Sequence, residues 1–143
     1  MTALTTGRDT KRVVETQITL PVAASVTIYE GAIVVVNSAG YAAPATLGTN
    51  LRAVGRAAER VTNGVVAGAV TIKVDKGAFW YANAGADPVS LNDINMNCYL
   101  LDDQTVSLQG LGTNSIAGRV VNVDASLGVC VAIGTPGLGS LEP

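Results

Sequence analysis

Residue types that usually carry chemistry are scarce in this chain. It has no histidine and only two cysteines, Cys98 and Cys130. The lack of histidine removes the commonest general base and every histidine-containing catalytic triad. Two cysteines without histidine are also too few for the usual four-ligand zinc site. We therefore expect no catalytic residue, no metal and no cofactor, and we do not expect an enzyme.

The remaining reactive groups have simpler explanations. Asp102 and Asp103 form a carboxylate pair that could do acid–base work. They stand between two short apolar segments, however, where aspartate is favoured because its side chain accepts bonds from turn amides. Both cysteines stand among apolar neighbours, which favours two buried free thiols over a disulfide.

Two arginines attract attention because the sequence repeats their surroundings. Residues 47–50 (Leu-Gly-Thr-Asn) precede a Gly-Arg that ends at Arg56, and residues 111–114 repeat the phrase before Arg119. Each arginine could pair with a carboxylate across a subunit boundary, where its planar guanidinium fits well. Alternatively, each is an outward-facing strand residue beside a bulge glycine, and we favour this second interpretation.

The elements around these residues predict short β-strands. Residues 13–22 alternate between apolar and polar, which is typical of a half-buried strand. Residues 70–75 alternate in the same way, and residues 32–36 and 129–133 are continuous apolar runs. Residues 51–61 fit either a helix or a strand, and the repeat decides for a strand. Turns every 8 to 12 residues or so predict an all-β barrel or sandwich built from two similar units.

Composition indicates a subunit of an assembly. Charged residues make up 14% of the chain, against about 25% in an average protein. A surface with so few charges contains much apolar area, which soluble monomers rarely expose. The net charge of −2 predicts no general attraction to nucleic acid or to an anionic membrane. The start of the chain is polar and unlike a signal peptide, so we expect synthesis in the cytoplasm.

Several stretches resemble one known family. In the second half these are residues 102–106 (Asp-Asp-Gln-Thr-Val) and 117–124 (Ala-Gly-Arg-Val-Val-Asn-Val-Asp). In the first half they are residues 54–57 (Val-Gly-Arg-Ala) and the region that leads to Phe79. Over roughly residues 25–134 the chain resembles the head-decoration or capsid-cement proteins of tailed phages and prophages.

The resemblance implies an all-β protein on the outside of the capsid shell, which it stiffens against the pressure of packaged DNA. The implied partners are the major capsid protein and further copies of this chain, with a trimer favoured. The implied location is the exterior of the virion. The family has no catalytic residues to transfer.

Together these arguments predict three parts. Residues 1–24 are an N-terminal arm and strand, residues 25–134 a β domain with units at about 26–81 and 93–134, and residues 135–143 a C-terminal tail. We expect the N-terminal strand to add to the sheet edge of a neighbour. The aromatic trio at residues 79–81 is expected to anchor the core or a subunit contact. The candidate contact residues are Val14, Thr16, Ile18, Leu20, Arg56, Phe79, Trp80, Tyr81 and Arg119.

Two other functions stay open at this point. The chain could be another phage structural subunit, in the tail, the baseplate or the base of a fibre. It could also be a carbohydrate- or receptor-binding module, for which Trp80 and Tyr81 would be the exposed rings.

Overall fold

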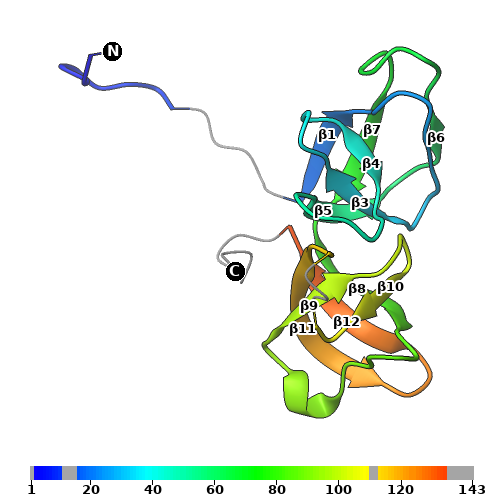
Figure 1. Ribbon diagram of the computed structural model, residues 1–143. Helices are drawn as coiled ribbons and strands as arrows, with labels where there is room; N and C mark the ends of the chain where they lie inside the picture. Colours follow the sequence, from blue (N-terminus) through cyan, green and yellow to red (C-terminus); the bar gives the residue numbers. More distant parts are fainter. Residues whose placement is uncertain (1, 11–15, 110–112, 135–143) are drawn as a thin grey trace.

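The computed structural model describes residues 2–10, 16–109 and 113–134, and it is all-β, as predicted. Figure 1 shows two lobes of strands stacked on one another. The first lobe contains β1 (Gln17–Pro21), β2 (Thr27–Ile28), β3 (Ile33–Val36), β4 (Ala42–Pro44), β5 (Arg52–Ala57), β6 (Val61–Thr62) and β7 (Thr71–Asp75). The second contains β8 (Gly77–Asn83), the 3-10 turn η1 (Leu91–Asp93), β9 (Asn97–Leu100), β10 (Thr105–Ser107), β11 (Ile116–Asp124) and β12 (Gly128–Ile133).

The two lobes share one topology. The second is a closed barrel with the strand order β10-β8-β12-β11-β9, in which β10 and β8 run parallel. The first is a five-stranded sheet with the order β1-β7-β5-β3-β4. A parallel bridge between Val22 and Ala42 joins its two edges. Strands β1, β3, β4, β5 and β7 of the first barrel are thus equivalent to β8, β9, β10, β11 and β12 of the second, which confirms the predicted pair of similar units.

The two barrels also close through the same hydrogen bond. In the first, the Ala23 amide donates to the Ala42 carbonyl oxygen at 2.9 Å. In the second, the Ala84 amide donates to the Val106 carbonyl oxygen, also at 2.9 Å. These two pairs therefore mark equivalent positions and set the register in which the two units can be compared.

One closing bond is missing from the first barrel, and the reason is a proline. In the second barrel the Ala82 amide donates to the Gln104 carbonyl oxygen at 2.9 Å. The equivalent position in the first barrel is Pro21, which has no amide hydrogen to donate. The first barrel therefore lacks this one closing hydrogen bond.

The repeated Gly-Arg is a structural requirement at its glycine. Gly55 and Gly118 lie beside the register shifts of β5 and β11, respectively. A Cβ at Gly55 would stand 2.1 Å from the Asp75 carbonyl oxygen, and one at Gly118 would stand 2.2 Å from that of Ala132. Only glycine lets the backbones approach so closely. The glycine lies within a strand in both copies. Within residues 51–61, β5 covers residues 52–57, so this part of the range is a strand, as the repeat predicted.

Two apolar cores hold the molecule together. One fills the first barrel and includes Val34 and Val74. The other fills the second barrel and extends onto the first, where it includes Ile33, Val35 and Ala45. Strand β3 is therefore buried on both faces, which explains why its sequence is a continuous apolar run instead of an alternating one.

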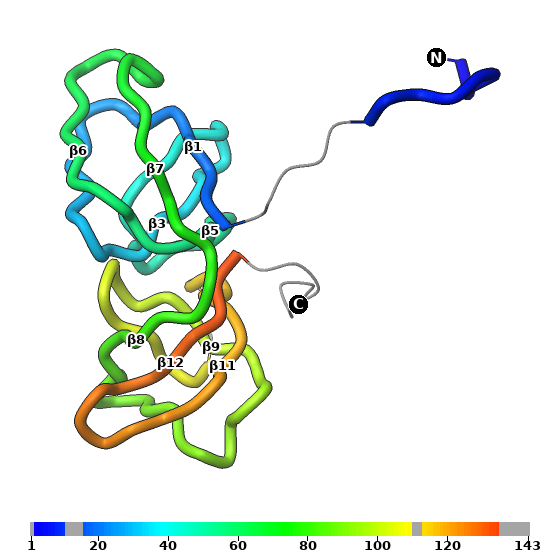
Figure 2. The backbone as a smooth tube through the Cα atoms, turned by 180° about the vertical axis from the view of Figure 1, so that it is seen from behind, coloured from blue at the N-terminus to red at the C-terminus, as the bar shows by residue number. Residues whose placement is uncertain are grey.

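The unit boundary differs from the expected one. The first unit was expected to reach Tyr81, but β8 belongs to the second barrel, where it pairs with β12 and β10. The chain passes from β7 to β8 through Lys76, which Figure 2 shows as a continuous descent from one lobe to the other. The aromatic trio therefore lies in the second barrel.

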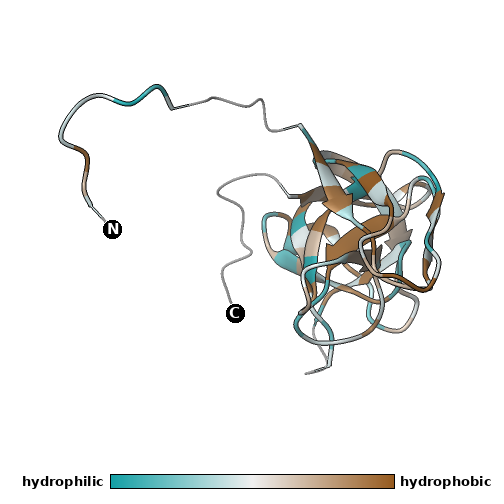
Figure 3. Cartoon of the chain, turned by 90° about the horizontal axis from the view of Figure 1, so that it is seen from above, coloured by the Kyte–Doolittle hydropathy of each residue, from teal (hydrophilic) through white to brown (hydrophobic). Residues whose placement is uncertain are grey.

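The N-terminal region also differs from the expected one. Strand β1 pairs antiparallel with β7 of its own chain along its whole length, from Gln17 opposite Asp75 to Pro21 opposite Thr71. It is therefore an edge strand of the first barrel, which begins within the predicted arm, and its addition to a neighbour's sheet stays a prediction. Among the described residues, 2–10 have the character of an arm: all are exposed, and they run away from the strands (Figure 3).

Candidate functional site

The carboxylate pair belongs to a turn, as the sequence favoured. The side chain of Asp102 accepts a bond from the Gln104 amide at 2.9 Å. Asp103 contributes its carbonyl oxygen, which accepts the Ile33 amide of the first barrel at 2.8 Å. Both residues therefore have roles in holding the chain together.

The cysteines are free buried thiols, which confirms the favoured interpretation. Cys98 lies inside the second barrel with its sulfur 3.7 Å from the Gly118 carbonyl oxygen. Desolvation raises the pKa of Cys98 to about 12, and burial also raises the pKa of Cys130. A thiol with a raised pKa is a poor nucleophile, because the thiolate is the reactive form.

Arg56 finds its carboxylate within its own chain. Its guanidinium lies 4.0 Å from the Asp75 carboxylate on the neighbouring strand and donates to the Ala57 carbonyl oxygen at 3.3 Å. Asp75 also accepts a bond from the Gln17 side chain at 2.8 Å. The guanidinium and the carboxylate are both about one-third exposed, so solvent screens their attraction. The contact ties together β1, β5 and β7 and does not depend on a second subunit.

Arg119 occupies the equivalent position but has a different partner. Ala132 stands opposite it, where Asp75 stands opposite Arg56. Its guanidinium instead donates to the Asn95 side chain at 2.6 Å. In both barrels the arginine is a partly exposed strand residue beside a bulge glycine, which is the favoured interpretation.

The aromatic trio divides between the two faces of β8. Phe79 and Tyr81 pack into the second core, and Tyr81 is only 6% exposed. Its hydroxyl donates to the Gly31 carbonyl oxygen of the first barrel at 3.2 Å. Desolvation raises the pKa of Tyr81 to about 12. Trp80 points outward and is 39% exposed.

The other candidate contacts lie at the start of the first barrel. Ile18 and Leu20 are half-buried and pack against the first core. Thr16 is exposed, and its carbonyl oxygen accepts the Lys76 amide at 2.9 Å. Val14 lies outside the described residues. The predicted contacts are therefore dispersed over both barrels and do not converge on one site.

The best-defined contact surface of the molecule is one that the sequence did not reveal, the junction between the barrels. The outer face of β3 and β4, which we call the first wall, packs onto one end of the second barrel; its residues are Ile33, Val35, Ala43 and Ala45. Besides the bonds to Asp103 and Tyr81, the Ser115 hydroxyl donates to the Gly48 carbonyl oxygen at 2.8 Å. The unbroken apolar run in residues 32–36 was the one sequence signal for this contact.

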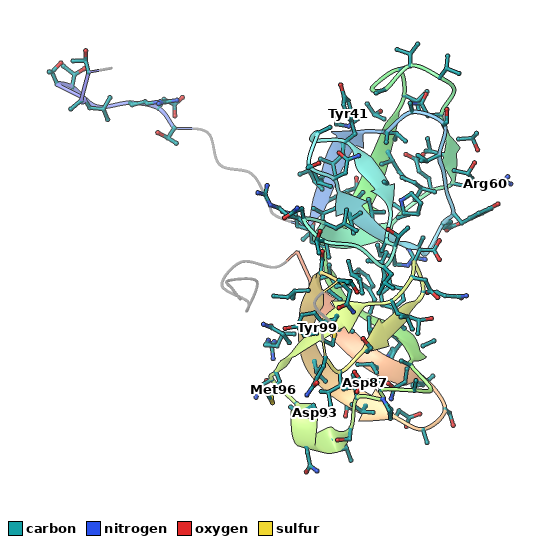
Figure 4. The ribbon with its side chains drawn as sticks, in the orientation of Figure 1. Tyr41, Arg60, Asp87, Asp93, Met96 and Tyr99 are labelled. Atoms are coloured by element: carbon teal, nitrogen blue, oxygen red, sulfur yellow. The ribbon has the colours of Figure 1, made fainter. Side chains whose placement is uncertain are left out.

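The second barrel carries an equivalent outer face that is partly exposed: Gln109 is exposed, Asn97 and Tyr99 are half-buried, and Ser107 is buried. By the register of the strands, Asn97, Tyr99, Ser107 and Gln109 occupy the positions of Ile33, Val35, Ala43 and Ala45. We call this face of β9 and β10 the second wall. It borders a shallow hollow of about 520 Å³ that is also lined by Asp93, Asn95, Met96 and Leu108. Figure 4 shows Tyr99, Met96 and Asp93 along one side of the second barrel.

A second hollow, of about 440 Å³, lies beside Trp80 at the β11–β12 hairpin. Asp124 lines it and accepts the Ser126 and Leu127 amides, which lower its pKa. Within the described residues, no group of three histidine, cysteine or acidic side chains is arranged to hold a metal ion. In the same part of the chain, no helix has the length and apolar character needed to span a membrane.

Comparisons with models of protein families, with curated proteins and with solved structures each find no match to this chain.

Proposed function

We propose that this chain is a phage capsid decoration protein, which binds the major capsid protein on the outside of the shell and stabilises the shell against internal pressure. It acts together with further copies of itself. The proposal starts from the resemblance of residues 25–134 to such proteins and from the low share of charged residues.

The structural observation that carries the proposal is a body with an extension. The body consists of two barrels with a shared core, which suits it to resist deformation. The extension, residues 2–10, is fully exposed and lies apart from both barrels. A rigid body with an extended arm can contact two places on a shell at once, and such contacts, repeated by symmetry, give firm binding from weak individual interactions.

The test compares the full chain with a chain that lacks residues 2–10, in binding to empty shells of the phage's major capsid protein. Both proteins are expected to fold, since the deletion stops short of β1. Binding by the shortened chain, measured by co-sedimentation, is expected to fall at least about tenfold. A deletion that extends to residue 22 is not suitable, because it removes β1 and the fully buried Val22 from the first barrel.

The matched control replaces residues 2–10 with a glycine–serine segment of equal length, which is expected to bind as poorly as the deletion. Normal decoration by the shortened chain would show that the arm is not a contact. Failure of the full chain to bind any shell would overturn the decoration function itself. Electron microscopy of complete particles would then show whether the chain belongs to the tail, the baseplate or a fibre base.

The exposed ring of Trp80 supports one alternative, a carbohydrate- or receptor-binding module. Aromatic rings beside polar side chains are a common sugar-binding arrangement, and Asn83, Asp124 and Ser126 line the same hollow. Tyr81, the other ring suggested by the sequence, also borders the hollow but is only 6% exposed. This alternative requires binding on a glycan array that Trp80→Ala abolishes, and loss of shell binding is not expected for that variant.

A further inference from the structure

We propose that copies of this chain associate head to tail: the second wall of one copy docks onto the open end of the first barrel of the next. By open end we mean the end that holds the β3–β4 turn, residues 37–41, and the starts of β1 and β5. The inference deepens the self-association included in the proposed function and assigns the surfaces that carry it.

The first argument is that this contact already exists once inside each chain. The first wall packs onto the end of the second barrel that holds the β9–β10 turn. At its centre the Ile33 amide donates to the Asp103 carbonyl oxygen at 2.8 Å. The outer face of the β3–β4 pair is therefore complementary in shape to the end of a barrel of this fold.

The second argument is that each chain has one more wall and one more end of the same kind. The β3–β4 and β9–β10 turns are closed by equivalent backbone hydrogen bonds. In the first turn the Asn37 amide donates to the Tyr41 carbonyl oxygen at 3.0 Å, and in the second the Leu101 amide donates to the Thr105 carbonyl oxygen at 3.1 Å. Ala39 is therefore the counterpart of Asp103. A backbone bond to its carbonyl oxygen depends on position and hardly at all on the side chain, so the open end can accept it as the second barrel does.

The third argument is that the open end is incompletely covered. Leu20 and Val36 are only half-buried there. Their counterparts in the second barrel, Tyr81 and Leu100, are 6% and 0% exposed. The described part of the chain supplies no wall over the open end, and a docked wall would remove apolar surface from water in the same way as at the junction.

The second wall differs from the first in polarity, and this sets the strength of the contact. Tyr99 replaces Val35, and Asn97 replaces Ile33. The exposed side chain of Met96 lines the hollow beside it. Tyrosine and methionine with polar neighbours are typical of interfaces that form and separate, whereas permanent interfaces are more apolar. We therefore expect reversible association.

A contact between two different surfaces is heterologous, so it forms a ring if the rotation closes and a chain if it does not. The occupant is a second copy because every copy presents both surfaces. A foreign partner would need to reproduce a wall that this fold already supplies.

The test is analytical ultracentrifugation of the isolated protein at increasing concentration. The average mass of the natural chain is expected to rise with concentration. Tyr99→Glu disrupts the wall and Val36→Lys disrupts the end, and each is expected to weaken association at least about tenfold. Leu20→Lys is a second end variant in case Val36→Lys fails to fold. The control, Val65→Lys, alters a side chain that is 85% exposed at a loop tip and should associate as the natural chain does.

The decisive measurement mixes the two defective variants. The Tyr99→Glu chain keeps an unaltered open end, and the Val36→Lys chain keeps an unaltered second wall. These two surfaces can bind each other once, so the mixture is expected to form one-to-one pairs and nothing larger. A mixture that stays monomeric, or a natural chain that stays monomeric at about 1 mM, would overturn the inference. So would association that neither variant weakens. No shell is present, so these failures leave the decoration test unaffected.

Discussion

Single residues show which part of the repeated phrase is structural. Gly55 and Gly118 approach a neighbouring backbone in the same way, whereas Arg56 and Arg119 differ in partner, an aspartate in one barrel and an asparagine in the other. The glycine is thus required by the fold at both places. The arginine is compatible with the strand position and takes whatever acceptor its own barrel provides.

Substitution of Gly118 by alanine tests the close backbone approach. The new Cβ would lie 2.2 Å from the Ala132 carbonyl oxygen, so the strands must separate. We expect Gly118→Ala to lower the free energy of unfolding by about 3 kcal/mol, as overpacking does, measured by urea denaturation. Gly85→Ala is the matched control, because nothing lies within 4 Å of the added carbon. Equal stability of the two variants would show that the approach is not needed.

The buried thiol of Cys98 predicts how stability depends on pH. Desolvation raises its pKa from 9.0 to about 12, so the folded protein keeps a proton that the unfolded chain loses. The stabilisation that the protonated thiol gives to the folded state is fully present below pH 9 and is lost as the pH rises toward 12. The free energy of unfolding then falls by up to about 1.4 kcal/mol per pH unit. Tyr81 acts in the same direction above pH 10.

The variant Cys98→Ser removes the titrating group while its hydroxyl can still reach the Gly118 carbonyl oxygen. We expect its free energy of unfolding to fall less steeply between pH 8 and pH 10.5 than that of the natural chain. Each protein is compared with its own value at pH 7, so the change in baseline does not matter. Parallel curves would mean that Cys98 is not the group responsible.

Among the elements, local patterns in the sequence predicted the strands well. The repeat assigned residues 51–61 to a strand although their alanines favour a helix, because the second copy is β-branched, and β5 covers residues 52–57 of that range. Alternation predicted β7, and turn residues predicted the β9–β10 hairpin. What was missed concerns pairing: β1 joins its own sheet, and β8 opens the second barrel. Pairing partners depend on contacts far apart in the chain, and spacing within a segment carries no record of them.

The closing bonds of the barrels provide a test at the level of an element. Ala82→Pro removes the amide that donates to Gln104 and makes the second barrel resemble the first at this position. We expect the free energy of unfolding to fall by about 1 kcal/mol, because the strand loses this hydrogen bond. Ala82→Ser keeps the amide, and its side chain is exposed, so its free energy of unfolding should stay close to that of the natural chain. Chemical denaturation distinguishes them, and a neutral Ala82→Pro would show that closure does not depend on this bond.

For the whole molecule, the junction makes two barrels into one cooperative body. The second core is built from both barrels, since Ile33, Val35 and Ala45 belong to it. Separating the barrels would expose these side chains and break the bonds to Asp103 and Tyr81. Neither barrel buries its apolar surface completely by itself, which is typical of repeated units that are stable only when stacked.

Calorimetry tests whether this shared core couples the barrels. We expect the natural chain to unfold in a single transition, with equal calorimetric and van't Hoff enthalpies. Val35→Asp places a charge in the junction without entering the first core, so the two barrels should then unfold separately, the second at a lower temperature. Thr71→Asp is the control, because it adds the same charge on the exposed face of β7. Two transitions in the natural chain, or an unchanged single transition in Val35→Asp, would mean that the barrels are joined only by the connection between β7 and β8.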